Sequence, residues 1–201
     1  MIHNTLFLAS QSISRRLLLE QADISYKTIQ QDADEYSCDW TVLPKELVTH
    51  LALLKMQHAQ LPSGQESDIC FVLTADTVGY DSNNTIYGKA QDKAEAIKNL
   101  KLLAHGFVAT GFCLEKKEYK QGSWHTILQI TEVVESAYVF EVPDNDIETY
   151  FSKTGALETA GSIAIEGYGL QFLKSVQGSY TGIIGLPLFE LRQALEKLGF
   201  F

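Results

Sequence analysis

Hydrophobic residues along this chain recur at two spacings, one typical of strands and one typical of helices. Short apolar runs bounded by polar or turn-forming residues predict strands over residues 5–10, 25–30 and 69–75. Apolar positions three and four residues apart predict helices over residues 13–22, 45–59 and 93–104. The first half of the chain is therefore expected to alternate strands with helices.

The second half contains more consecutive strand patterns. It predicts strands over residues 107–116, 124–140 and 161–176, a helix over 144–153, and a last helix from Pro187 that stops at Gly199. Alternating elements followed by adjacent strands predict an α/β fold on a mixed central sheet with flanking helices and a cleft between two lobes. Because the chain contains no repeat, low-complexity tract or proline-rich linker, one continuous domain over residues 1–201 is expected.

The composition is that of a globular protein. Hydrophobic residues make up 45% and charged residues 20% of the 201 positions, and no apolar run approaches the roughly eighteen residues that span a bilayer. The segment MIHNTLFLAS has neither a basic leader nor a long apolar run, so we expect no signal peptide, no membrane partner and a cytoplasmic location. The formal net charge of -9 disfavours nucleic acid as a partner, so any phosphate site should be local.

Two adjacent arginines stand where an isolated helix does not favour them. Arg15 and Arg16 follow the serines of LASQSIS, in the first turn of a helix that Ser12 is placed to cap. The N–H groups of a helix N-terminus already present positive charge, so cations are unfavourable there. Either the arginines are solvated, with Arg16 paired to Glu20 one turn later, or an anion such as phosphate supplies the missing negative charge.

Four further residues fit a site but also have ordinary explanations. Lys55 shares the apolar face of the second predicted helix, where it could extend to solvent or serve a site. Asp76 ends the apolar run CFVLTAD, and ligand sites in α/β sheets collect beyond the carboxyl ends of strands, although an aspartate there can also cap a turn. Glu35 belongs to an acidic loop and Lys89 precedes the third predicted helix, so both could be plain loop residues.

Taken together, the stretches that carry these residues resemble the Maf family of nucleoside-triphosphate pyrophosphatases. The similar segments are, in order, LASQSISRRLLLEQADISY, the DE of DADEY, LALLK, TADTV, YGK, VATGFCL, TGALETAGS, EGYG and GSYTGIIGLPL. This resemblance covers nearly the whole chain and implies a mixed-sheet α/β fold with a deep cleft. It also implies a divalent metal, Mg²⁺ or Mn²⁺, and hydrolysis of a nucleotide between the α and β phosphates. A homodimer is a further family expectation.

The resemblance also implies roles for individual residues. The side chains similar to the family's phosphate-binding groups are Ser10, Ser12, Arg15, Arg16, Lys55 and Lys89. Glu35 and Asp76 match the family's acidic pair, which would hold the metal, with Asp76 as acceptor of the proton from the attacking water. The chemistry needs such a set, because crowded phosphate oxygens need cations and a water needs a base and a metal to attack phosphorus.

Three positions bear on the base of the nucleotide. One family subgroup carries Ser-Pro-Arg-Arg, and the other, associated with 7-methyl-GTP, has one more residue before the arginines; Ser14 occupies that extra position here. Glu166 in AIEGYG also resembles the 7-methyl-GTP subgroup, and a carboxylate suits the N–H donors of guanine. Thr77 in TADTV instead resembles the subgroup directed to pyrimidines.

Three functions follow from these features. Hydrolysis of 7-methyl-GTP, as removal of a modified nucleotide, is expected from the spacing at Ser14 and from Glu166. The same reaction on dTTP or UTP is the first alternative, which Thr77 favours. The second alternative is a nucleotide-binding regulatory protein that has lost turnover, and the retention of the acidic pair and both lysines argues against it.

Overall fold

The computed structural model describes residues 4–201 as a mixed α/β fold, as predicted. Its strands are β1 (Thr5–Leu8), β2 (Tyr26–Thr28), β3 (Ile69–Tyr80), β4 (Ile86–Tyr87), β5 (His105–Lys120), β6 (Ser123–Phe140) and β7 (Leu173–Gln177). Its α-helices are α1 (Ile13–Gln21), α2 (Pro44–Gln57), α3 (Lys93–Leu102), α4 (Ile147–Lys153), α5 (Tyr180–Ile184) and α6 (Leu188–Lys197). Short 3-10 turns occupy Glu35–Ser37, Asp144–Asp146, Ala156–Glu158 and Gly167–Phe172.

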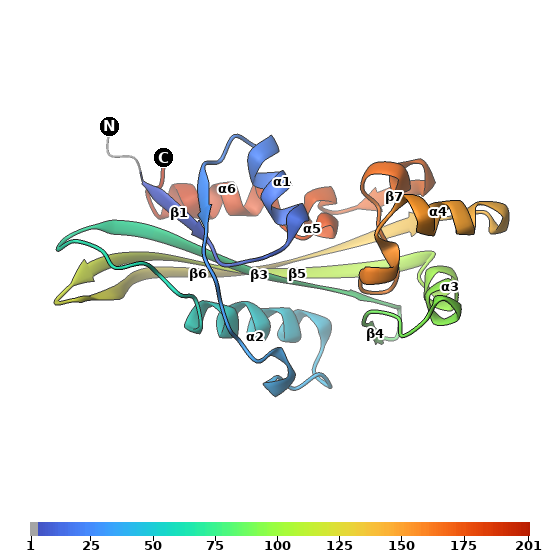
Figure 1. Cartoon of the computed structure of the whole chain (residues 1–201), viewed down its shortest axis with the longest axis horizontal. Coiled ribbons are helices and arrows are strands. Elements are labelled where there is room, and N and C mark those ends of the chain that lie inside the picture. Colours follow the sequence, from blue (N-terminus) through green and yellow to red (C-terminus); the bar gives the residue numbers. More distant parts are fainter. Residues whose placement is uncertain (1–3) are drawn as a thin grey trace.

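The strands form one seven-stranded sheet in the order β2-β1-β3-β5-β6-β7, with β4 paired to β3 beside this path. β1 is parallel to both of its neighbours, whereas β3, β5, β6 and β7 pair antiparallel in turn. Figure 1 shows the long strands β3, β5 and β6 as an elongated central layer. The mixed sheet therefore combines a parallel edge with a long antiparallel ladder.

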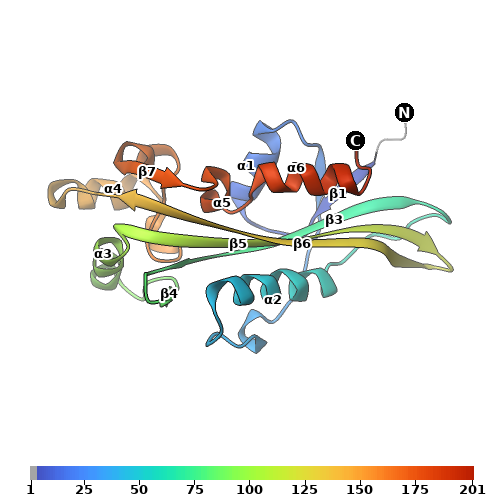
Figure 2. The ribbon, with the colours of Figure 1, turned by 180° about the vertical axis from the view of Figure 1, so that it is seen from behind.

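Helices cover both faces of this sheet. α1, α5 and α6 lie on one face and α2 lies on the opposite face (Figures 1 and 2). Successive side chains of β3 point to opposite faces, so Phe71 packs with Leu19 and Leu195 on the α1 side, whereas Val72 packs with Ala52 on the α2 side. A further apolar cluster joins α3, α4 and the end of β6. None of the helices within residues 4–201 is long and apolar enough to cross a membrane.

One edge of β3 is paired only in part. β5 pairs with β3 along residues 69–80. On the other edge β1 pairs with residues 70–73 and β4 with residues 79–80, so neither strand pairs with residues 74–78. We call residues 74–78 of β3 the edge gap. Because side chains alternate along a strand, Asp76 faces α2 and Thr77 faces α1 at this gap.

Most predicted elements agree with the structure to within a few residues, but the end of the third strand does not. The strand expected over residues 69–75 continues to Tyr80. Asp76 therefore lies inside β3, and the prediction that it follows the end of a strand was wrong. The physical reason is that β5 pairs with all of β3, which overrides the weak strand preference of Asp76 and Gly79.

The predicted strand over residues 161–176 is wrong for most of its length. Residues 167–172 form a 3-10 turn, and only residues 173–177 form a strand. The turn packs closely, because a Cβ added to Gly169 would lie 1.9 Å from the carbonyl oxygen of Ala164. The glycines that interrupt this apolar run thus fold it into a compact loop, and this loop carries Glu166.

Candidate active site

The turn between β1 and α1 surrounds a buried arginine with serine oxygens. Ser12 caps α1 as predicted, because its Oγ accepts a hydrogen bond from the backbone N–H of Arg15 at 3.4 Å. Ser10 is buried, and its Oγ accepts from the Ser12 N–H at 3.3 Å and from Arg15 Nη1 at 3.0 Å. The serine cluster therefore holds the guanidinium as well as capping the helix.

Arg15 is buried rather than solvated. Its Nε donates to the carbonyl oxygen of Gly185 at 2.8 Å, and its Nη2 donates to Thr77 Oγ1 at 3.2 Å. Burial lowers the pKa of Arg15, while the negative charges of Asp76 and Glu35 act to raise it. Its acceptors are all neutral oxygens, and within residues 4–201 no carboxylate forms an ion pair with it. This buried positive charge favours the anion-binding explanation over the solvated one.

Two residues that support Arg15, Thr110 and Gly185, were missed by sequence reasoning. Thr77 Oγ1 lies 2.9 Å from Thr110 Oγ1, which donates to the carbonyl oxygen of Gly182 at 2.8 Å. Gly185 has φ of +123°, a conformation that only glycine adopts easily, and its carbonyl faces Arg15 Nε. The glycines in GSYTGIIGLPL are the one sequence signal that could have indicated this backbone approach.

On the other face of the sheet, a buried lysine joins two carboxylates. Lys55 projects from α2 and is only 7% exposed, so it does not extend to solvent. Its Nζ lies 3.0 Å from Glu35 Oε1 and also forms an ion pair with Asp76 Oδ1. The structure thus brings together three of the predicted site residues, which come from a loop, a helix and a strand far apart in the sequence.

The two clusters meet at the edge gap. Thr77, on the α1 side, contacts Arg15, and the adjacent Asp76, on the α2 side, contacts Lys55. No strand pairs with residues 74–78 on this edge in the part of the chain that the structure describes. The edge gap therefore places a buried cation on each face of the sheet, next to the unpaired edge of β3.

A cavity of about 290 Å³ lies on the α1 side of the gap. Polar side chains at its wall are Ser12, Ser14, Arg15, Thr77, Thr159 and Glu166. Most of the rest comes from residues of β5, β6 and α5, from Leu103 and from the segment of residues 160–165. Ser14 Oγ donates to Glu166 Oε2 at 2.7 Å. We call this space the base cavity. It brings together all three residues that the sequence associates with the choice of base.

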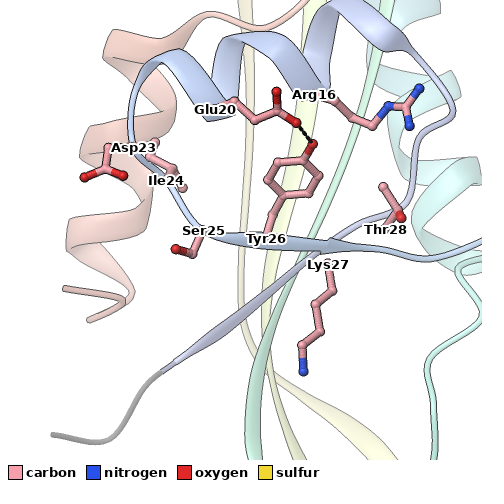
Figure 3. A pocket seen from close by; sticks show the side chains of 8 residues that line it. All are labelled: Arg16, Glu20, Asp23, Ile24, Ser25, Tyr26, Lys27 and Thr28. Carbon is pink, nitrogen blue, oxygen red and sulfur yellow. Dashed lines mark hydrogen bonds between the residues drawn. The ribbon is translucent and has the colours of Figure 1, made fainter.

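Arg16 points to a different surface from Arg15. It lines a shallow cavity with residues of the α1 end and β2: Glu20, Asp23, Ile24, Ser25, Tyr26, Lys27 and Thr28 (Figure 3). Glu20 accepts a hydrogen bond from the Tyr26 hydroxyl at 2.8 Å, and no ion pair links it to Arg16 among the described residues. The Nε atom of Arg16 is buried without a hydrogen-bond partner within residues 4–201. Arg16 also lines a cavity with Ser10, whose Oγ accepts from Arg15 Nη1, so the two arginines point to different cavities but both lie near Ser10.

Lys89 lies outside the buried ion-pair cluster. Its backbone forms an antiparallel bridge with Ala160, and its Nζ lies 3.8 Å from Glu158, with both of those side chains largely exposed. Lys89 nevertheless lines an open cavity together with Glu35. The structure thus places this lysine at the same cavity as Glu35, without the direct contact with Glu35 that Lys55 makes.

Comparison with known proteins gives the family of the chain. The family model described as Maf-like protein matches residues 5–198. The chain belongs to the Maf-like family. Among its relatives, the dTTP/UTP pyrophosphatase of Syntrophus aciditrophicus is 33% identical over 202 residues, covering 99% of this chain and 92% of the relative. The dTTP/UTP pyrophosphatase of Bacillus cytotoxicus is 35% identical, covering 94% and 93%, and the nucleoside triphosphate pyrophosphatase of Prochlorococcus marinus is 33% identical, covering 96% and 97%.

The donor atoms of this Maf-like site fit a divalent ion that arrives with a phosphate ligand. Oxygens of Glu35 and Asp76 converge on one cation, the ammonium of Lys55. Within residues 4–201 no group of three His, Cys, Asp or Glu side chains could hold a metal ion by itself. Mg²⁺ in nucleotide sites is commonly bound by one or two carboxylates together with substrate phosphates. Two carboxylates are therefore a sufficient protein contribution.

Proposed function

We propose that this protein hydrolyses a nucleoside triphosphate between its α and β phosphates, giving a nucleoside monophosphate and pyrophosphate. The observation that carries this proposal is the edge gap, where buried Arg15 contacts Thr77 on one face of the sheet and buried Lys55 contacts the adjacent Asp76 on the other. The family and the names of its relatives, which include nucleoside triphosphate pyrophosphatase, support the same reaction.

In the proposed reaction, the oxygen of a water molecule attacks the α-phosphorus. The bond from that phosphorus to the bridging oxygen breaks, and its electron pair leaves with pyrophosphate. Asp76 accepts the proton of the attacking water, while Arg15 and Lys55 offset the charge on the phosphate oxygens. A divalent ion held by Glu35 and Asp76 would supply further positive charge and acidify the water.

The proposed substrates are dTTP and UTP, rather than the 7-methyl-GTP expected from the sequence. The relatives named dTTP/UTP pyrophosphatase support this choice. For this choice of base, the Ser14 hydroxyl, whose one proton is donated to Glu166 in the structure, rotates to donate to a carbonyl oxygen of the base, while Glu166 accepts from the base N–H. Uracil and thymine present one N–H between two carbonyl oxygens, so they need an acceptor beside a donor, as an amide side chain would provide.

7-methyl-GTP is the second candidate, and Glu166 is the observation that favours it. A carboxylate accepts from both N–H groups of guanine and attracts the positive charge of a 7-methylated base. The oxygen of Glu166 that Ser14 does not bind, Oε1, is the acceptor such a base would use first. The two candidates therefore differ in whether the Ser14 hydroxyl takes part in binding the base.

A substrate panel separates these functions. The protein is incubated with Mg²⁺ or Mn²⁺ and with dTTP, UTP, dCTP, GTP or 7-methyl-GTP, and pyrophosphate and the monophosphate are measured. The proposal predicts the highest kcat/KM for dTTP and UTP, and a loss on Ser14→Ala that is confined to these two. Highest activity on 7-methyl-GTP would support the second candidate, and tight binding of every nucleotide without turnover would exclude an enzyme.

The role of Asp76 has its own test. Asp76→Asn keeps the size of the side chain and removes the proton acceptor, so we expect turnover to fall by about a hundredfold or more while nucleotide still binds. Asp81→Asn is a suitable control, because Asp81 also belongs to the β3 region but bonds only its own turn and Tyr87. Near-normal turnover in Asp76→Asn would remove this residue from the mechanism.

A further inference from the structure

The open cavity that Glu35 and Lys89 line, described above, lies on the α2 side of the sheet (Figure 1). It measures about 740 Å³ and is lined by Ala33, Asp34, Glu35, Tyr36, Trp40, Gly88 and Lys89. The segment between β2 and α2, which supplies most of these residues, lies on the α2 side of the sheet (Figure 1). We call this space the aromatic cavity. Glu35 both lines the aromatic cavity and pairs with Lys55, so the cavity adjoins the ion-pair cluster at this residue.

Two aromatic rings are exposed at this cavity. Tyr36 is 92% exposed and Trp40 is 42% exposed. The Trp40 Nε1–H donates to the carbonyl oxygen of Glu35 at 3.2 Å, and the Asp34 side chain caps the turn that carries Tyr36. The surrounding turn thus fixes the Trp40 ring without covering it. Exposed aromatic rings are surfaces on which nucleobases stack, and Lys89 is the cation at this cavity, beside the carboxylates of Asp34 and Glu35.

The order of groups along the site gives this surface a specific position relative to the phosphates. Arg15 and Thr77 line the base cavity, and Asp76 follows Thr77 along β3. Lys55 pairs with both Asp76 and Glu35, and Glu35 lines the aromatic cavity. A nucleotide with its base in the base cavity and its α-phosphate at Asp76 therefore directs its β and γ phosphates toward the aromatic cavity.

We propose that the aromatic cavity accepts a second nucleoside, so that the protein also hydrolyses dinucleoside triphosphates, in which the terminal phosphate of a nucleoside triphosphate carries another nucleoside. This proposal rests on the function proposed above. The second base stacks on Tyr36 and Trp40, and Lys89 at the rim is available to the phosphate next to it. Such a ligand fills both cavities, whereas a nucleoside triphosphate fills one.

The chemistry at Asp76 stays the same for this substrate. The water oxygen forms a bond to the α-phosphorus at the gap, and the bond from that phosphorus to the bridging oxygen breaks. Its electron pair leaves with a nucleoside diphosphate instead of pyrophosphate, and Asp76 accepts the proton of the water. The products are one nucleoside monophosphate and one nucleoside diphosphate, and water is the only co-reactant.

The test compares diuridine triphosphate with UTP as substrates of the full chain. Wild type is expected to release UMP and UDP from diuridine triphosphate. Tyr36→Ala and Trp40→Phe should each lower kcat/KM on diuridine triphosphate, by about tenfold for Tyr36→Ala, and change kcat/KM on UTP less than twofold. Phe189→Ala is the control, because Phe189 is 69% exposed and lies outside the cavity, and it should affect neither substrate.

Two results would overturn the proposal. If UTP is hydrolysed and diuridine triphosphate is not, the second nucleoside has no place in the site. If the aromatic variants lose activity equally on both substrates, the rings serve the nucleoside of the ordinary substrate. If neither substrate is hydrolysed, the function proposed above fails, and tryptophan fluorescence then decides the inference. Quenching by diuridine triphosphate that exceeds quenching by UTP and is lost in Trp40→Phe supports binding of a second nucleoside at the aromatic cavity, although hydrolysis is then excluded, and equal quenching rejects this binding too.

Discussion

Replacing Lys55 by methionine tests the ion-pair cluster at the centre of the site. The variant keeps most of the side-chain volume but removes the ammonium that Glu35 and Asp76 share. The side chain of Asp76 is 11% exposed, so its carboxylate would be left buried without its cation. Breaking a buried pair by removing one partner costs about 3–5 kcal/mol, so we expect a loss of that size in the free energy of unfolding.

A double-mutant cycle separates this pair from other effects of the substitution. Asp76→Asn alone should cost about 1–3 kcal/mol, because Lys55 keeps Glu35 as a partner. Lys55→Met combined with Asp76→Asn should cost less than the sum of the two, with a coupling energy of about 1.5–3 kcal/mol. Glu35→Gln is the control, because the Glu35 side chain is 41% exposed and should contribute at most about 1 kcal/mol.

Urea unfolding at pH 7 measures each free energy, with the m-value as a check that the transition stays comparable. The unfolding measurements are repeated with Mg²⁺, because removal of Lys55 leaves the two carboxylate oxygens that it paired with available to a metal ion. At tenfold excess over its Kd, the ion would stabilise Lys55→Met by about 1.4 kcal/mol. A coupling energy below about 0.5 kcal/mol would refute the reasoning, because the pair would then be as weak as a surface ion pair.

Three further predictions concern residues around the site. Gly169→Ala should lower stability by more than about 2 kcal/mol in urea unfolding, because its Cβ would overlap a backbone carbonyl, while Gly155→Ala, which meets open space, should change little. Burial alone would raise the pKa of Glu135, but hydrogen bonds from a lysine and from the Tyr80 hydroxyl lower it. The stabilisation that the ionised Glu135 carboxylate gains from these hydrogen bonds is present above its unfolded pKa of about 4.3. It is lost as the pH falls through the folded pKa of Glu135. Tyr80→Phe should therefore cost about 1 kcal/mol at pH 7 and progressively less below about pH 4, as thermal melts across pH would show. A thiol reagent should modify only Cys38 in the folded protein, since the other two cysteines are buried, and fast modification of all three would contradict the structure.

The elements of the fold could be predicted from hydrophobic spacing because most strands and helices here have one buried face. The prediction failed where pairing partners rather than local pattern decide the structure. Asp76 and Gly79 disfavour strands, yet β5 pairs with both. Residues 161–176 have the apolar content of a strand, but positive φ at Gly161 and Gly167 turns the chain into a loop. A single sequence contains little information on either effect.

In the candidate site, too, the sequence indicated the chemical type of the residues but not which side chains pack together. Each residue that touches Arg15 or Lys55 through a side chain has a chemical type that the sequence could single out. Glu35, Asp76 and Thr77, which the sequence analysis named, each contact one of these two cations. The sequence could not show that Arg15 and Arg16 diverge, because adjacent residues on a helix point about 100° apart and only packing decides which one is buried.

The edge gap separates the parts of the site that must stay fixed from those that can vary. Asp76 belongs to a strand held along its whole length by β5, so its position does not depend on the segments that flank the gap. The β1–α1 turn, the loop that carries Glu166 and the segment at Tyr36 each reach the gap from outside that ladder. An exchange of these segments would alter which nucleoside is accepted while leaving the proposed proton acceptor in place, so a library confined to them is a practical route to enzymes for other nucleotides.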